Sequence, residues 1–331
     1  MLKVGLIGAG TMGRTHKKAY DQLDHARVVA ICDLQPEKAE RIAGPDVKVV
    51  KDYMEILQDP EIDVVDVCLP TYLHREVVLK ASAAGKHVFC EKPIALNIKD
   101  AEEMSVACAK AGVKLGVGHV VRFFPDYYRL KDVIASGRIG EPKVIRTSRG
   151  GSFPSRKDNW YADYSKSGGP IVDLIIHDFD FLLWLFGPVQ RVFAKSVRGR
   201  EMFDHTFVTL RFENGIIAHV EGVWSAPAGT PFSTSYEVAG TEGLYEYSSG
   251  SSTPLILRTS EGEQRGKSVP RSPLTISPYA AQLSAFFEAI EKDQPVPVSA
   301  QDAIKALEVA LAAYQSATTG EVVWLGGTRH G

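Results

Sequence analysis

Short apolar stretches alternate with segments of helical periodicity through the first third of the chain. Val, Ile and Leu dominate six stretches that predict strands, at residues 3–7, 28–32, 47–50, 64–68, 87–90 and 114–118. Apolar residues recur at helical spacing at 36–43, 53–58, 75–84 and 98–111. Nearly continuous apolar strands are typical of a parallel sheet that is covered on both faces. The alternation predicts an α/β Rossmann domain, a doubly wound parallel sheet, over residues 1–121.

The pattern changes after about residue 120. A helix is predicted at 127–136, and mostly alternating positions predict strands at 143–149, 189–197, 206–212, 216–224, 234–239 and 255–258. Glu213-Asn214-Gly215 is typical of a tight hairpin, because Asn and Gly tolerate positive φ. Further helices are predicted at 171–185, 279–292 and 300–318, and surface loops at 248–252 and 261–266. This order predicts an α+β domain with an antiparallel sheet over residues 122–331.

Charge and composition exclude several protein classes. The 38 Lys and Arg residues against 40 Asp and Glu leave a net charge of -2, so there is no basic excess for nucleic acid. Acidic residues interrupt the most apolar region, 171–186, which argues against a membrane span. The first apolar stretch is too short for a signal peptide, and we therefore expect a cytoplasmic protein. Four cysteines without CxxC spacing predict buried thiols and no metal site.

A glycine motif follows the first predicted strand: Gly8-Ala9-Gly10-Thr11-Met12-Gly13. In dinucleotide-binding folds the first glycine allows a tight turn, the second admits a pyrophosphate, and the third lets the helix pack on the strand. Asp33 ends the second strand 20 positions after Gly13, where an acidic residue binds the adenosine ribose. The motif predicts a dinucleotide site, and a carboxylate at this position favours NAD over NADP, whose 2′-phosphate it would repel.

Two later strand ends carry further candidates. Pro70 and Thr71 lie at the carboxyl end of a parallel strand and are predicted to contact the cofactor. His74 either contacts the cofactor or faces solvent at the start of a helix. Glu91-Lys92-Pro93 ends the fifth strand, where a lysine beside a nicotinamide can stabilise an alkoxide as hydride leaves carbon. The alternative for Lys92 is a surface lysine before a turn.

The predicted helix at 171–185 carries polar side chains through an apolar segment. Asp173 and His177 are four residues apart and are expected to share one helix face. A histidine with a pKa near neutrality can accept a hydroxyl proton during hydride transfer. A buried structural histidine is the alternative.

Taken together, these motifs resemble the Gfo/Idh/MocA oxidoreductase family, with inositol 2-dehydrogenases among its similar members. The resemblance covers nearly the whole chain and rests on the glycine loop, Glu91-Lys92-Pro93, Arg122-Phe123, Ile139-Gly140-Glu141-Pro142 and Gly168-Gly169-x-x-x-Asp173-x-x-x-His177. It implies a Rossmann domain followed by an open-faced antiparallel sheet that forms homodimers or homotetramers. It also implies a substrate site between the two domains.

The resemblance also implies residue roles. Lys92 matches the family's catalytic lysine, Asp173 the acid that holds neighbouring substrate hydroxyls, and His177 the general base. Glu91 and Lys92 are expected beside the cofactor, and Lys92-Pro93 is expected to be a cis peptide, as in relatives.

Substrate contacts are predicted at Arg122, Tyr236, Asp158 and Trp160. For Arg122 and Tyr236 the alternatives are a structural salt bridge and a sheet aromatic. The loop at 153–161 differs from that of an inositol dehydrogenase, which is expected to show a His and an Asn for the ring hydroxyls. Arg156, Lys157 and Trp160 in this loop would suit an acidic or larger sugar. We expect NAD-dependent oxidation of a secondary hydroxyl of a cyclic polyol or sugar. The alternatives are an enzyme acting on a nucleotide-linked or acidic sugar, and a non-catalytic dinucleotide-sensing regulator.

Overall fold

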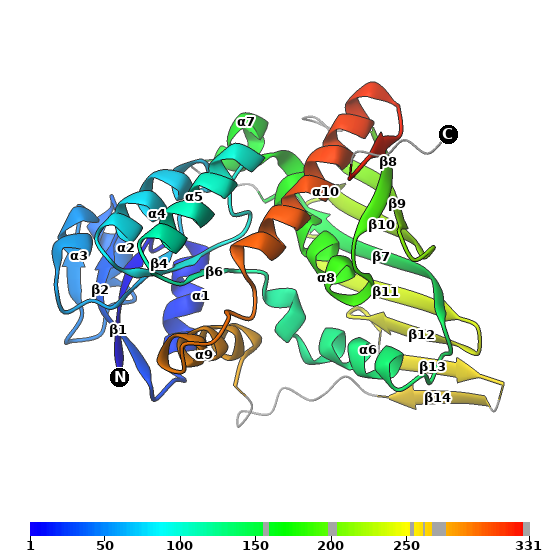
Figure 1. Cartoon of the computed structure of the whole chain (residues 1–331), viewed down its shortest axis with the longest axis horizontal. Coiled ribbons are helices and arrows are strands. Elements are labelled where there is room, and N and C mark those ends of the chain that lie inside the picture. Colours follow the sequence, from blue (N-terminus) through cyan, green and yellow to red (C-terminus); the bar gives the residue numbers. More distant parts are fainter. Residues whose placement is uncertain (155–158, 198–203, 252–254, 261, 267–275, 327–331) are drawn as a thin grey trace. The chain divides into compact units, whose positions relative to one another are not determined.

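The computed structural model describes residues 1–154, 159–197, 204–251, 255–260, 262–266 and 276–326. The chain forms two compact units (Figure 1). The first comprises Met1–Phe123 and Pro273–Ile304, and the second comprises Phe124–Ser272 and Lys305–Gly331. Within the described residues, no helix combines the length and the apolar character needed to cross a membrane.

A six-stranded parallel sheet in the order β3-β2-β1-β4-β5-β6 forms the centre of the first unit. Its strands are β1 (Leu2–Ile7), β2 (Ala26–Cys32), β3 (Lys48–Val50), β4 (Val64–Val67), β5 (His87–Cys90) and β6 (Leu115–Val117). Its helices are α1 (Thr11–Tyr20), α2 (Pro36–Glu40), α3 (Met54–Gln58), α4 (His74–Ala83), α5 (Ile98–Lys110) and α9 (Pro278–Glu291). The strand order reverses between β1 and β4, which is where ligands bind in such sheets. The predicted Rossmann fold is confirmed.

Helix α9 belongs to the first unit, although residues 122–331 were predicted to form the second domain. Phe286 packs edge-to-face on Phe89 of β5, with ring centroids 5.3 Å apart. A Cβ atom at Gly116 of β6 would lie 2.6 Å from the Phe286 ring, so a glycine is needed at this position. The Gln282 side chain also donates to the Val117 carbonyl at 3.1 Å. Apolar periodicity predicts the helix but not which sheet it covers, and this explains the misassignment.

The second unit is built on a nine-stranded sheet in the order β14-β13-β12-β11-β7-β10-β9-β8-β15. The strands are β7 (Pro142–Ser152), β8 (Val189–Val197), β9 (His205–Phe212), β10 (Ile217–Ala226), β11 (Ser233–Gly240), β12 (Gly243–Ser248), β13 (Leu255–Thr259), β14 (Gly262–Gly266) and β15 (Val323–Trp324). Strands β7 and β10 pair in parallel, so the sheet is mixed rather than purely antiparallel. The segment predicted as a loop at 261–266 contains strand β14, whose polar sequence lacks an apolar alternation.

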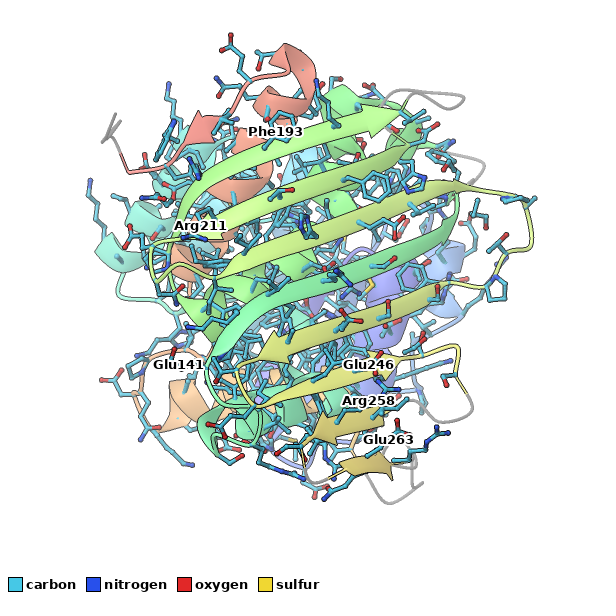
Figure 2. The ribbon with its side chains drawn as sticks, turned by 90° about the vertical axis from the view of Figure 1, so that its right-hand side faces the viewer. Glu141, Phe193, Arg211, Glu246, Arg258 and Glu263 are labelled. Atoms are coloured by element: carbon cyan, nitrogen blue, oxygen red, sulfur yellow. The ribbon has the colours of Figure 1, made fainter. Side chains whose placement is uncertain are left out.

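Helices cover one face of this sheet and leave the other open. They are α6 (Pro125–Ala135), α7 (Tyr164–Ser167), α8 (Ile176–Phe186) and α10 (Ala300–Thr319). Tyr127 of α6 and Phe181 of α8 both contact the ring of Tyr236 on β11, at 5.3 and 6.4 Å between centroids. Figure 2 looks onto the open face, with Phe193 of β8 labelled among its side chains.

Candidate functional site

The glycine loop between β1 and α1 has the geometry that the motif predicts. Gly8 has a φ of 100°, and a Cβ atom there would lie 2.5 Å from the Cys68 carbonyl oxygen. A Cβ atom at Gly13 would collide with the Gly8 carbonyl oxygen, so helix and strand pack too closely for any other residue. A Cβ atom at Gly10, the N-cap of α1, would meet no described atom within 4 Å. Half-buried Thr11 and Met12 form the first turn of α1, whose N–H groups suit a pyrophosphate.

Asp33 lies beside this loop, directly after β2. Its Oδ2 accepts a hydrogen bond from the Ala9 N–H at 2.8 Å, and its Oδ1 accepts one from the Gln35 N–H at 2.9 Å. The carboxylate is therefore held next to the glycine motif at the carboxyl end of the sheet, where the motif predicts an adenosine ribose.

We expect Asp33→Ala to weaken NAD binding and to raise the relative use of NADP by roughly tenfold or more. A hydrogen bond to a charged group contributes about 1.5–3 kcal/mol, and the change also removes a negative charge that repels the 2′-phosphate. Fluorescence titration with NADH and NADPH measures both affinities. Asp33→Asn is the matched control, because it keeps an acceptor for the Ala9 N–H and removes only the charge. An unchanged preference in both variants would show that other residues select the cofactor.

The loop after β4 excludes one of the two alternatives for His74. Thr71 is buried in the 3-10 turn that follows Pro70. His74 is also fully buried, and it does not face solvent. Its Nδ1 lies 2.9 Å from the Pro93 carbonyl oxygen and its Nε2 lies 2.8 Å from the Leu69 carbonyl oxygen. Burial lowers its pKa. His74 therefore joins the loop after β4 to the loop after β5.

Glu91-Lys92-Pro93 directly follows β5, and the Lys92-Pro93 bond is cis. Glu91 is buried and Lys92 is half-buried. The Lys92 backbone N–H donates to the Glu91 carboxylate at 3.1 Å. The glycine loop, Asp33, Thr71 and this turn all lie at the carboxyl ends of neighbouring parallel strands, as the sequence predicts.

Asp173 and His177 lie in the second unit, on a segment that is not one continuous helix. Gly168 and Gly169 have positive φ and lead into a single π-helical turn, η4 (Pro170–Leu174). The turn is closed by the Ile175 N–H, which donates to the Pro170 carbonyl at 2.9 Å. Asp173 is buried within it, and His177 is half-buried in the first turn of α8. The shared-face argument assumed α-helical spacing throughout, and the wider π turn changes that spacing. Such turns are frequent at functional sites.

An ion pair that the sequence reasoning missed fixes the start of α8. Arg149 of β7 donates from Nε to the Asp178 carboxylate at 2.6 Å, and both side chains are buried. Burial alone would lower the pKa of Arg149, but Asp178 raises it. Asp178 is the residue after His177, so the pair anchors the His177 turn to the sheet. The sequence could have indicated this pair, because Arg149 occupies an inward-facing position of a predicted strand, where a charged residue needs a buried partner.

The remaining substrate candidates have structural contacts within their own units. Arg122 is buried, with Nη2 3.7 Å from the Asp302 carboxylate. Tyr236 is buried and its hydroxyl donates to the Asp126 carbonyl at 2.7 Å. These contacts support the structural alternatives for both residues. Trp160 is half-buried and stacks on its neighbour Tyr161 at 4.1 Å. Asp158, together with residues 156 and 157, lies outside the described residues.

Comparisons with known proteins agree with this geometry. Residues 2–119 match the model of an oxidoreductase family with an NAD-binding Rossmann fold, and residues 127–246 match the GFO/IDH/MocA C-terminal domain. A myo-inositol 2-dehydrogenase of Thermotoga maritima is 32% identical, over 95% of this chain and 96% of that protein. A 1,5-anhydro-D-fructose reductase of Ensifer adhaerens is 32% identical, over 97% of this chain and 98% of that protein.

A solved structure extends the comparison to the fold. Levoglucosan dehydrogenase in complex with NADH and levoglucosan superimposes with a TM-score of 0.87 at 25% identity, covering 99% of this chain and 100% of that chain. The glycine loop and Asp33 described above suit the same cofactor. The chain therefore belongs to the Gfo/Idh/MocA family and is an NAD-dependent oxidoreductase.

Proposed function

We propose that the protein oxidises a secondary hydroxyl of a cyclic polyol or sugar. The observation that carries the proposal is the retention of Lys92, Asp173 and His177 together, each at a structured position: after β5, in the π turn, and at the start of α8. Relatives named for myo-inositol and for an anhydro-sugar support this substrate class. A regulator that only senses the dinucleotide would have no need for all three side chains.

Bound NAD supplies the hydride acceptor in this chemistry. His177 accepts the proton of the reacting hydroxyl as the general base. The Lys92 ammonium is a hydrogen-bond donor that can stabilise an oxygen as it develops negative charge. The Asp173 carboxylate accepts hydrogen bonds from neighbouring hydroxyls and thereby orients the ring.

The test is to incubate the purified protein with NAD and a panel of compounds and to follow the absorbance of the reduced nicotinamide. The panel contains inositols, anhydro-sugars, free sugars, uronic acids and nucleotide-linked sugars. Turnover of a neutral cyclic polyol or sugar supports the proposal. Turnover confined to acidic or nucleotide-linked sugars would replace the substrate class, and NAD binding without any turnover would favour a sensor.

We also propose that the open sheet face holds a second copy of the chain. Phe207 of β9 is 54% exposed on this face, and Phe193 of β8 is 37% exposed. Between the strands, Arg146 pairs with Glu237 at 2.9 Å and His205 with Glu221 at 2.8 Å. A face that combines exposed aromatic rings with charges of both signs can be complementary to itself across a two-fold axis.

Phe207→Glu is expected to shift the protein from oligomer to monomer, because it places a charge in the apolar part of this face. Light scattering measures the mass before and after the change. Val106→Glu is the matched control, since Val106 is also exposed but lies on helix α5 of the first unit. A wild-type protein that is monomeric at micromolar concentration would contradict the proposal.

A further inference from the structure

A cluster of buried polar side chains lies next to the glycine loop in the first unit. His16, on α1, has its Nδ1 2.8 Å from Asp66 Oδ2 on β4 and its Nε2 3.1 Å from Glu91 Oε1 after β5. The Tyr20 hydroxyl donates to Asp66 as well, at 2.9 Å. His16, Asp66 and Glu91 are each no more than 4% exposed. One imidazole thus connects the dinucleotide helix, the central sheet and the Glu91-Lys92-Pro93 turn.

The charges in this cluster complement one another. Burial alone would lower the pKa of His16, but Asp66 and Cys68 together raise it well above its usual value. Burial alone would raise the pKa of Glu91, but His16 lowers it. The His16 imidazole therefore lies between two acidic side chains, whose negative forms favour its positive form.

Three side chains in and beside this cluster are of the kinds that ligate metals. Ligand atoms of His16, Asp66 and Cys68 lie within 4.8 Å of one another. Burial raises the pKa of the Cys68 thiol, which disfavours the thiolate form that binds metals. Both ring nitrogens of His16 already lie within 3.1 Å of carboxylate oxygens. The cluster is best explained by the contacts it makes inside the protein.

Glu91 carries the effect of His16 onward to Lys92. While Oε1 faces His16, Oε2 accepts the Lys92 backbone N–H at 3.1 Å. Gly118 makes room for this carboxylate, because a Cβ atom there would lie 2.7 Å from Glu91 Oε1. On the other side of Lys92, the Pro93 carbonyl is held by His74 at 2.9 Å. The backbone is thus fixed on both sides of the lysine.

We propose that His16 is a positioning residue, which holds Glu91 and through it fixes the Lys92 backbone relative to the dinucleotide-binding helix. The role of Lys92 in turnover rests on the proposed function, whereas the contact from His16 to the Lys92 amide does not. A misplacement of about 1 Å at a reacting group can lower a rate by roughly a hundredfold. A side chain remote from the substrate can therefore control kcat.

Two substitutions of similar shape separate the contact that His16 makes with Asp66 from the one it makes with Glu91. In His16→Asn the amide nitrogen reaches the place of Nδ1, so the contact with Asp66 is kept and that with Glu91 is lost. In His16→Gln the amide nitrogen reaches the place of Nε2, so the contact with Glu91 is kept. We expect His16→Asn to lower kcat by roughly 10- to 100-fold with unchanged NAD affinity, and His16→Gln to stay within about fivefold of wild type. Equal kcat values in the two variants at similar melting temperatures would overturn the proposal.

Hydrogen exchange at the Lys92 amide tests the same contact without any turnover. This amide is protected by its bond to Glu91, and loss of a buried hydrogen bond exposes an amide to exchange. Exchange is expected to be about tenfold faster in His16→Asn than in His16→Gln. If the wild-type protein oxidises no polyol, the proposed function fails, while this measurement still decides the role of His16. Equal exchange rates would overturn it.

A third variant covers the case in which neither His16 variant folds. Glu91→Gln keeps an oxygen for the Lys92 N–H and removes the charge that pairs with His16. We expect a loss of kcat of roughly tenfold or more with little change in melting temperature. A wild-type kcat in Glu91→Gln would contradict the proposal.

Discussion

His177→Ala is expected to lower kcat by roughly two to four orders of magnitude, the usual contribution of a general base. The imidazole lies in the first turn of α8, which the buried Arg149–Asp178 pair anchors to β7. Its removal leaves the hydroxyl proton without an acceptor, while the glycine loop, which belongs to the first unit, is untouched. The affinity for NAD is therefore expected to stay nearly constant. Steady-state kinetics on the substrate that the panel identifies, together with NADH titration, measure both quantities.

Chemical rescue separates a lost base from a damaged fold. Added imidazole is expected to restore part of the His177→Ala activity, because a small base can occupy the vacated space. His25→Ala is the matched control, since His25 lies before β2 and outside both predicted sites. A His177→Ala protein with near-normal kcat would remove His177 from the mechanism.

The Rossmann unit was predictable because its signals are local. All four residues of β4 are buried, and such a strand appears in the sequence as a short, mostly apolar stretch, here with one buried acid, Asp66. The turn between β9 and β10 was also predictable from the sequence, and Gly215 has the positive φ that Asn-Gly predicts. These features depend on residues that are adjacent in the chain, so they can be predicted directly from the sequence.

Long-range pairing was not predictable in the same way. The parallel pairing of β7 with β10 joins segments about 70 residues apart, and no residue pattern distinguishes it from an antiparallel pair. The π turn at Pro170–Leu174 has the same apolar composition as a helix. The segment packs against β10 because residue 222 is a glycine: a Cβ atom there would lie 2.7 Å from Ile175. This close approach is visible only in three dimensions.

The candidate site shows the same difference between local signals, which the sequence displays, and long-range contacts, which it does not. The glycine loop and Asp33 were identified because their spacing is part of a motif, and each occupies the position expected. The buried partners were not identified. His74 bonds a carbonyl 19 residues away, and His16 contacts Asp66 at a separation of 50 residues. A histidine on an amphipathic helix gives no sign in the sequence of which distant carboxylate it meets.

Lys92→Met is expected to lower kcat by roughly two to three orders of magnitude, comparable to the loss of one donor that stabilises a developing oxyanion. Methionine preserves most of the apolar length of the side chain, so the half-buried stem keeps its packing while the ammonium is lost. Glu91 still accepts the residue 92 backbone N–H, and the turn itself should persist. Single-turnover measurement of hydride transfer, with NAD saturating, isolates this effect from cofactor affinity.

The comparison with Lys92→Arg decides whether charge alone is enough. Arginine keeps the positive charge but presents it as a planar fork on a three-carbon stem, so it cannot place one donor where the ammonium lies. We expect Lys92→Arg to recover less than about a tenth of the lost rate, which would assign the effect to the position of the donor. Full recovery by arginine would instead assign it to the local electrostatic potential. Lys99→Met, at an exposed position on α5, is expected to leave kcat unchanged. If Lys92→Met weakened NAD binding in proportion to kcat/KM and left hydride transfer at saturation unaltered, the lysine would serve the cofactor and not the reacting oxygen.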